Sequence, residues 1–424
     1  SVDFDSGSNT YSATTNLPTI MVGSDQTEVL VGGGGDDRLI ANEGDDTLDG
    51  GTGDDRLIGG EGDNLFRVTS GDDVITIGGG SDTLQLAGSV FGIKQADGNL
   101  RFDASLNGEV YSATILDQLN DPLTNIELID SSGGVLRYSF AVGTDASESV
   151  DPTFVVGSDN AETLTGGSSN DQLIANDGDD ILIGGAGDDA LAGGEGVDTA
   201  SYFDTDLAIT VDLTSGDAFG EDVGSDKLFS IENVIAGAGD DTVTGDAGDN
   251  IISAGEGDDF VLGGAGADIL DGGAGIDTAS FEDATSTLTV DLAAGTAGSK
   301  ETGSDKLSGF ENVIAGSGDD SLTGDGEDNA LFGGGGSDTL DGAAGNDTLS
   351  GGAGDDVYIV SDGDDRIITG GGSDRLEISS GYTIETALLD PETGDLTFAL
   401  VKGDGSHHSV VVEGHETAPI STLR

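Results

Sequence analysis

A nine-residue repeat is the feature that most limits what this chain can fold into. From Gly32 the sequence reads GGGGDDRLI, ANEGDDTLD, GGTGDDRLI, GGEGDNLFR, VTSGDDVIT and IGGGSDTLQ. The sixth position is almost always Asp, and the eighth is almost always a large apolar residue. An acidic low-complexity linker also favours Gly and Asp, but nothing in it would hold an apolar residue at one fixed phase. The period therefore indicates an ordered repeat protein.

The repeat is interrupted, and the interruptions predict the domain organisation. Blocks of seven, five, five and seven units occupy residues 23–85, 157–201, 236–280 and 315–377. The other segments are expected to be an N-terminal lead-in, a β-rich insert or cap, two β-hairpin inserts and a C-terminal β-rich cap, at residues 1–22, 86–156, 202–235, 281–314 and 378–424 respectively.

Each unit divides into a six-residue turn and a three-residue strand. Side chains of a strand alternate between faces, so only the central apolar residue, such as Leu39, Leu48 or Leu57, points inward. A strand this short needs neighbours above and below it. With two units in each coil, turns on the same edge lie 18 residues apart. The prediction is an all-β fold, a parallel β-roll in several blocks.

The two hairpin inserts belong to a duplicated segment. Residues 157–235 align with residues 236–314, each consisting of five units followed by an insert. In the first insert Leu207, Ile209, Val211 and Leu213 alternate with other residues, as expected of a half-buried strand. We expect each insert to form a β-hairpin flap over a solenoid that continues beneath it.

Charge decides what the chain must bind in order to fold. The sequence contains 83 acidic and 13 basic residues, a formal net charge of −70, together with 75 glycines and 5% aromatic residues. Self-repulsion opposes compaction in such a chain, and few large apolar groups offset it. A basic partner, a very salty medium or bound metal cations would neutralise the acid, and the regular spacing favours cations. Nucleic acid is excluded as a partner because phosphate binding needs clustered Lys and Arg.

The turn chemistry predicts calcium. Glycines at positions one, two and four permit positive φ and close backbone approach, which turns carbonyl oxygens toward a shared point. Position six adds a carboxylate. Calcium takes six to eight oxygen ligands, more than one such turn supplies. The turn around Asp37 should therefore share an ion with the turn around Asp55, whereas the turn around Asp46 belongs to the opposite edge.

The predicted ligands follow from this register. The side-chain ligands are Asp37, Asp46, Asp55, Asp73, Asp82, Asp171, Asp180, Asp189, Asp198, Asp241, Asp259, Asp268, Asp277, Asp320, Asp338, Asp347, Asp356, Asp365 and Asp374. The backbone carbonyl ligands include those of Gly32, Gly35, Gly50, Gly53, Gly184, Gly187, Gly263, Gly266, Gly333, Gly336, Gly351 and Gly354. Interior turns allow at most 16 ions, and degenerate turns reduce the expected number to about a dozen. Acids at position five, such as Asp36, Asp45, Asp54 and Asp188, are interpreted as solvated turn residues.

These residues resemble the RTX nonapeptide GGxGxDxUx, a calcium-binding β-roll repeat. The units GGTGDDRLI, GGAGDDALA and GGAGADILD match it at every defined position. The resemblance implies a bacterial protein that is exported unfolded through a type I channel and folds outside the cell on meeting calcium. It also implies an uncleaved C-terminal secretion signal, which residues 379–424 would contain, although the ending PISTLR lacks the short apolar tail common in the family.

Signatures of catalysis are missing from the sequence. There is no Cys, no Gly-x-Ser-x-Gly motif and no Gly-Lys-Ser/Thr phosphate loop. His415 and Glu416 look like half of a zinc-protease motif, but Pro419 occupies the position of the second His. His407 and His408 are expected in a surface turn. We therefore expect a protein that is not an enzyme. No apolar run is long enough for a transmembrane segment, and the first residues lack the pattern of a cleavable secretory signal.

Three functions are compatible with these features. The leading hypothesis is a secreted, extracellular or cell-surface calcium-binding structural protein, a surface-layer, matrix or adhesin component, with self-association or a cell-surface glycan as partner. The alternative is the export and folding region of a secreted exoenzyme, such as a protease, lipase or polysaccharide epimerase. A third reading makes residues 87–156 a carbohydrate-binding module.

Overall fold

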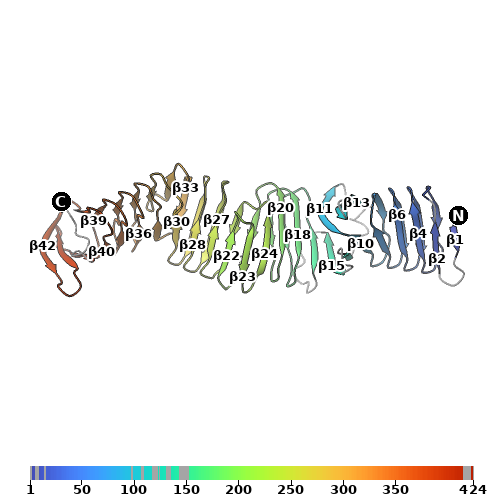
Figure 1. Ribbon diagram of the computed structural model, residues 1–424. Helices are drawn as coiled ribbons and strands as arrows, with labels where there is room; N and C mark the ends of the chain where they lie inside the picture. The colour runs from blue at the N-terminus through green and yellow to red at the C-terminus, as the bar shows by residue number, and fades with distance from the viewer. Residues whose placement is uncertain are drawn as a thin grey trace. The chain divides into compact units, whose positions relative to one another are not determined.

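The computed structural model describes residues 2–4, 9–13, 16–96, 99–106, 109–116, 123, 125–129, 135–142, 152–413 and 422–423. These residues form strands and turns without any helix, and so none of them belongs to a helix long and apolar enough to cross a membrane. The chain forms two compact units, comprising Ser1–Ala200 with Val223–Ile231 and Ser201–Asp222 with Glu232–Arg424. Within each unit, successive strands stack side by side (Figure 1).

The nine-residue period produces this stack directly. Each unit supplies one strand, and that strand pairs in parallel with the strand 18 residues later, so that Leu39 lies beside Leu57 and Leu30 beside Leu48. Consecutive units therefore alternate between two walls. The fold is all-β and is a parallel β-roll, as the sequence predicted.

In the first unit the strands of one wall follow one another as neighbours. In order of pairing they are β1 (Val2–Phe4), β2 (Thr10–Ala13), β4 (Val29–Gly34), β6 (Thr47–Thr52), β8 (Leu65–Val68), β10 (Thr83–Ala87), β14 (Asn125–Ile129), β15 (Val135–Val142), β16 (Thr153–Val156), β18 (Gln172–Asp177), β20 (Ala190–Glu195) and β24 (Gly224–Phe229).

The opposite wall of the first unit consists of two runs. The first run is β3 (Ile20–Val22), β5 (Arg38–Glu43), β7 (Arg56–Glu61), β9 (Asp72–Thr76), β13 (Glu109–Leu116), β12 (Asn99–Leu106) and β11 (Ser89–Ala96). The second run is β17 (Thr163–Thr165), β19 (Ile181–Ile183) and β21 (Thr199–Ser201).

The segment after the first block joins both walls. Strand β13 pairs in parallel with β9, the last strand of its wall in the block, and continues through β12 and β11 as an antiparallel meander. Strand β14 pairs in parallel with β10. The described part of residues 86–156 thus extends both walls, since its strands pair with the last strand of each wall in the block.

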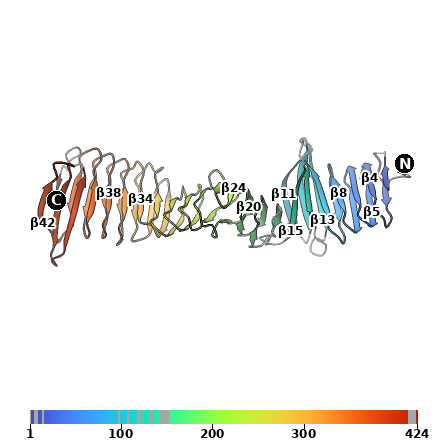
Figure 2. The same ribbon diagram turned by 90° about the horizontal axis from the view of Figure 1, so that it is seen from below.

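The second unit has the same two-walled plan. One wall is β23 (Asp217–Gly220), β22 (Ile209–Asp212), β26 (Thr242–Thr244), β28 (Phe260–Leu262), β30 (Thr278–Ser280), β34 (Asn312–Ile314), β36 (Ala330–Phe332), β38 (Thr348–Ser350), β40 (Asp365–Ile368), β44 (His407–Glu413), β43 (Leu396–Lys402) and β42 (Tyr382–Leu389). In Figure 2, β34 and β38 can be followed along this wall.

The other wall of the second unit contains the insert at residues 281–314. Its strands are β25 (Asn233–Ile235), β27 (Ile251–Glu256), β29 (Ile269–Ala274), β33 (Gly303–Ser308), β32 (Thr296–Ser299), β31 (Thr289–Asp291), β35 (Ser321–Thr323), β37 (Thr339–Asp341), β39 (Val357–Val360), β41 (Arg375–Ile378) and β45 (Thr422–Leu423).

This order confirms the predicted hairpin, since β31 and β32 pair antiparallel, but it shows that the second insert is not a flap over the wall. The chain leaves β30, places β31 beside β35, and returns through the antiparallel strands β32 and β33 to pair with β29. On the other wall, β30 pairs directly with β34. The antiparallel strands are therefore part of the wall itself, because their backbone groups complete the hydrogen bonds of β29 and β35 that would otherwise be unpaired.

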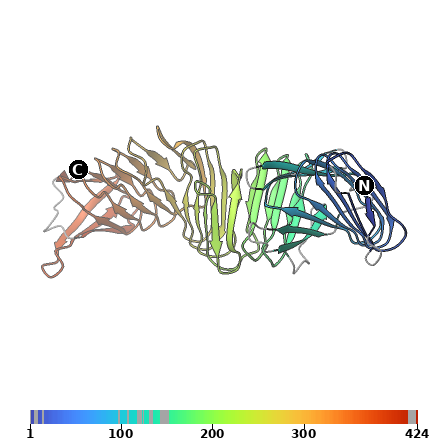
Figure 3. The same cartoon turned by 45° about the vertical axis from the view of Figure 1, so that its right-hand side comes forward.

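At the C-terminal end, an antiparallel meander closes one wall. Strand β44 pairs in parallel with β40, and β43 and β42 follow it as antiparallel neighbours. The red hairpin of β42 and β43 is visible at this end in Figure 3. The side chains of Arg366 and Glu413 join β40 to β44 through two hydrogen bonds of 2.6 and 2.7 Å.

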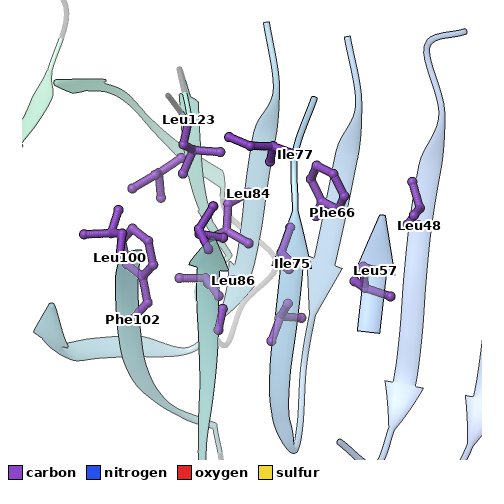
Figure 4. Packing of buried hydrophobic residues seen from close by; sticks show 14 of the residues in the cluster. Leu48, Leu57, Phe66, Ile75, Ile77, Leu84, Leu86, Leu100, Phe102 and Leu123 are labelled. Carbon is purple, nitrogen blue, oxygen red and sulfur yellow. The ribbon is translucent and has the colours of Figure 1, made fainter. Parts of the chain in front are cut away.

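The core is a column of inward apolar residues between the walls. Leu48, Phe66 and Leu84 from one wall and Leu57 and Ile75 from the other have no exposed surface (Figure 4). A buried side chain of this kind contributes about 1.5–3 kcal/mol. Because a nine-residue unit provides only one or two, apolar burial is sparse relative to the number of residues that folding must order.

Candidate metal sites

Every sixth-position Asp predicted as a ligand is buried, with at most 4% of its surface exposed. These side chains are buried because turns 18 residues apart stack in register. The Oδ1 atom accepts the backbone N–H of the sixth residue 18 positions earlier, at 2.7 Å from Asp37 N to Asp55 Oδ1 and 2.9 Å from Asp55 N to Asp73 Oδ1. The structure thus brings together the turns that the sequence paired.

The second carboxylate oxygen of many of these residues is buried without a hydrogen-bond donor among the described residues. A buried carboxylate is stable in its charged form only when it is paired with a positive group or bound to a metal, and otherwise it takes up a proton. These oxygens therefore identify where the turns need a cation. They are the Oδ2 atoms of Asp37, Asp46, Asp55, Asp180, Asp189, Asp259, Asp268, Asp277, Asp320, Asp338 and Asp356.

Glycine at position one keeps the space beside this oxygen open. A Cβ atom on Gly32 would lie 2.5 Å from both Asp37 Oδ2 and the carbonyl oxygen of Gly50 in the next coil. In the fourth block, a Cβ atom on Gly333 would lie 2.8 Å from Gly351 O and collide with Asp338 Oδ2. Each such pocket is lined by a carboxylate and a carbonyl, the oxygen ligands that calcium prefers.

The other predicted carbonyl oxygens face different partners, depending on whether they belong to position one or position four of the repeat. The carbonyl oxygen of Gly184 faces the turn of Asp171, and that of Gly263 faces the turn of Asn250. The position-four carbonyls face the position-four glycine of the following coil, which has positive φ, as at Gly53, Gly224, Gly303, Gly354 and Gly372. The oxygens facing these glycines belong to Gly35, Gly187, Gly266, Gly336 and Gly354.

Burial perturbs the acidity of the sixth-position carboxyls in the absence of metal. Desolvation raises the pKa of Asp73 to about 8 and that of Asp365 to about 7, with neighbouring carboxylates adding to the effect. In Asp338, desolvation raises the pKa to about 6 although the N–H of Asp320 opposes the shift. A bound divalent cation would lower the pKa of these carboxyls, since it favours their charged form.

Some turns are closed by the protein itself. The N–H of Gly167 donates to Asp171 Oδ2 at 2.6 Å, and the N–H of Gly237 donates to Asp241 Oδ2 at 3.1 Å. Where Asn replaces Asp, its amide finds a carbonyl, as at Asn250 Nδ2, which lies 2.6 Å from Glu232 O. The turns therefore differ in their need for a cation. We expect the open turns to bind calcium before the closed ones.

The position-five acids form a second ladder on the surface. Asp54 N donates to Asp36 Oδ1 at 3.1 Å, and Asp63 N donates to Asp45 Oδ1 at 2.9 Å. These carboxylates are exposed and bond to the coil after them, whereas the sixth-position carboxylates bond to the coil before them. Both acids thus satisfy backbone N–H groups in the turns.

The sequence prediction missed two acids of the inserts that occupy the same position. Asp226 Oδ1 accepts the N–H of Asp189 at 2.9 Å, and Asp305 Oδ1 accepts the N–H of Asp268 at 3.0 Å, both across 37 residues. Asp226 and Asp305 are 1% and 4% exposed. A signal was present, because GSDKL in each insert matches positions four to eight of the repeat.

These contacts change the basis for counting ions. The limit of 16 assumed that the last units of a block have no partner, but Asp189 and Asp268 have partners in the inserts. No group of three or more His, Cys, Asp or Glu within the described ranges lies close enough to hold a metal ion. A site here therefore requires backbone carbonyls, as the glycine pockets supply. The residues present fit calcium, and the number of ions stays a prediction.

His407 and His408 lie in the C-terminal meander. His408 Nδ1 accepts the N–H of Gly363 at 3.0 Å, so the neutral ring carries its proton on Nε2, which lies 3.1 Å from Ser406 Oγ. A protonated Nε2 cannot take a proton from that hydroxyl, so the pair lacks a general base. His407 is exposed and lies in β44 instead of the predicted turn. His415, Glu416 and Pro419 lie outside the described residues.

Comparison with known proteins identified a family and found likenesses among solved structures. A model of the RTX calcium-binding nonapeptide repeat, in four copies, matches residues 22–57, 49–84, 156–200, 230–261, 245–279, 307–340, 314–349, 332–360 and 350–381. No curated protein matches the chain. Among solved structures, an extracellular lipase from Serratia marcescens has 21% identity and a TM-score of 0.19, over 72% of this chain and 42% of the lipase. The chain thus spans less than half the length of that protein.

Proposed function

Because the chain belongs to the family of RTX calcium-binding repeat proteins, we propose that it is a non-catalytic extracellular structural protein whose calcium-loaded roll is the working structure. One observation carries this proposal. Buried sixth-position carboxylate oxygens without a donor recur along the described part of the stack, beside open glycine pockets. Ions at these places would neutralise the buried carboxylates and link each of them to a carbonyl of the next coil.

The residues that would hold the ions have distinct roles. In the turn pair of Asp37 and Asp55, Asp37 Oδ2 and Gly50 O face the pocket, while Asp55 Oδ1 holds the N–H of Asp37. Calcium supplies positive charge that neutralises the buried carboxylates. Gly32 leaves the space for it, because any side chain there would fill the pocket.

Location outside the cell follows from affinity and charge. Extracellular calcium modules bind at about 10⁻⁴ to 10⁻³ M, so the sites would remain empty at cytosolic calcium levels. A chain with a net charge of −70 would then stay expanded. Binding outside the cell would supply the folding free energy. Export by a type I channel and a signal after residue 378 fit this scheme and form part of the proposal.

A surface-layer, matrix or adhesin role is proposed from extent. The repeat is the main content of the chain, and its turns present exposed carboxylates at position five. Additional calcium could bridge such carboxylates between neighbouring copies or to an acidic cell-surface glycan. Partners that carry phosphate, such as nucleic acid, are disfavoured, since the chain has only 13 basic residues and they are spread along it.

The test has two stages. Circular dichroism during a calcium titration at pH 8 should show coil in excess chelator and β-structure in millimolar calcium, while a chain already β-structured in chelator at this pH would refute calcium-driven folding. Sedimentation of the folded protein should then show assemblies that a chelator dissolves. A monomer at every calcium concentration would refute the structural role and favour the exoenzyme alternative, for which intact-mass analysis should reveal a longer secreted protein.

A further inference from the structure

The chain returns from the second insert to the repeat through an unusually short turn. Strand β33 ends at Ser308 and β34 begins at Asn312, so that only Gly309, Phe310 and Glu311 lie between them. The inward residues Leu307 and Val313 are therefore only six positions apart, whereas those of consecutive regular units, such as Leu39 and Leu48, are nine apart. The shortened turn carries no nonapeptide, and its acid is Glu instead of Asp.

Glu311 nevertheless makes the contact of a sixth-position residue. Its Oε2 atom accepts the N–H of Asp277 at 2.9 Å, as Asp277 Oδ1 accepts the N–H of Asp259 at 2.8 Å. The backbone also keeps its register, because Asn312 N donates to Asp277 O at 2.9 Å. The additional methylene of Glu compensates for the shorter turn.

Gly309 supplies the carbonyl that position one supplies elsewhere. Its φ of +66° belongs to the left-handed region. A Cβ atom on Gly272 would collide with Gly309 O and lie 2.9 Å from Asp277 Oδ2. In the first block, Gly32 faces Gly50 O and Asp37 Oδ2 in the same way. The junction therefore reproduces the pocket of the repeat from different residues.

An unsatisfied buried group points into this pocket. Asp277 has no exposed surface, and its Oδ2 has no hydrogen-bond donor among the described residues. The neighbouring turn, in contrast, is closed, since Asn329 Nδ2 donates to Glu311 O at 3.1 Å. One side of Glu311 is thus satisfied by an amide, and the other side presents two carboxylates and a carbonyl.

We propose that Asp277, Gly309 and Glu311 form a divalent-cation site at the junction between the insert and the repeat. The proposal rests on calcium binding by the roll and extends it to a turn that lacks the repeat motif. Its ligands are the Asp277 carboxylate, the Gly309 carbonyl and the Glu311 carboxylate. The ion cross-links the end of the insert to the third block and fixes the point at which the stack resumes.

The first test counts ions on the full chain by native mass spectrometry in calcium. Glu311→Gln keeps an oxygen that accepts the N–H of Asp277 but removes the charge, so it should fold and bind one ion fewer than the wild type. Glu282→Gln, an exposed acid of the same insert, is the matched control and should bind the wild-type number. An unchanged ion number in Glu311→Gln would overturn the junction site. Absence of calcium from the wild type would instead refute the proposed function.

The second test needs no variant and covers the case in which Glu311→Gln fails to fold. A crystal structure of the wild-type chain grown in calcium, with a lanthanide soak for anomalous signal, should show an ion about 2.3–2.6 Å from the three ligands. Occupied sites in the regular turns together with no peak at this junction would refute the proposal.

Discussion

Two neighbouring glycines of one turn in the fourth block, Gly335 and Gly336, differ in whether the structure has room for a side chain. Gly336 has a φ of +130°, and a Cβ atom there would collide with the carbonyl oxygen of Gly318 in the coil before. A Cβ atom on Gly335 would meet nothing within 4 Å. Gly336→Ala should therefore destabilise the calcium-loaded roll, whereas Gly335→Ala should not.

The expected magnitude follows from two costs. A non-glycine residue in a sparsely populated φ region costs about 1–3 kcal/mol, and relief of the collision adds about 1–3 kcal/mol. The free energy of unfolding should fall by about 2–6 kcal/mol. Gly335→Ala should raise it by about 0.4–1 kcal/mol, because alanine reduces the freedom of the unfolded chain.

Calcium titrations followed by circular dichroism measure this difference. If about five ions bind as this part of the chain folds, the loss in Gly336→Ala raises the calcium midpoint about two- to eightfold. In Gly335→Ala the midpoint should fall by less than about 1.5-fold. Equal shifts in the two variants, or a larger shift in Gly335→Ala, would show that the collision with Gly318 does not govern stability.

Two further predictions concern the buried polar groups. In chelator, acid should replace calcium in part: desolvation raises the pKa of Asp73 to about 8 and those of Asp189 and Asp259 to about 7, so their contribution to stability is complete below the unfolded pKa of about 3.9 and is lost as pH rises through 7–8. Circular dichroism should thus show more β-structure at pH 4 than at pH 8, and the reverse order would contradict the burial of neutral carboxyls. Tyr358→Phe should cost about 1–3 kcal/mol in urea unfolding at saturating calcium, since the buried hydroxyl bonds to Gly351 N at 3.0 Å and Ile368 O at 3.3 Å; an unchanged midpoint would show that water satisfies both groups.

The regular part of the fold could be predicted because one period sets both the phase and the partner of every strand. Leu39 and Leu57 lie at the same position of units 18 residues apart, and they face inward as neighbours. The inserts have no such period. Alternation correctly predicted buried Ile209 and Val211, but it contains no information about which strand each one joins. Leu207, assigned to the same kind of strand, is 41% exposed and precedes β22.

The candidate site could be predicted only where the motif is explicit. The sixth-position acids follow from the repeat, and the structure buries all those predicted. The division into open and closed turns depends on whether a local N–H or amide reaches the side chain, as Gly167 N reaches Asp171. That depends on turn conformation, which one residue type does not determine. Glu311 was missed because its role arises from a pairing 34 residues away.

The inserts show what a roll of this kind requires of a foreign segment. Pairing across the second insert spans 37, 34 and 32 residues instead of 18. Each pairing still aligns inward residues, Leu270 with Leu307, Ala279 with Val313 and Val290 with Leu322. Where the insert rejoins the wall, an acid precedes the inward residue by two positions, as Asp305 precedes Leu307 and Glu311 precedes Val313. The constraint is therefore phase and not length, since a segment that restores one acid and one apolar residue in register lets both the core and the carboxylate ladder continue.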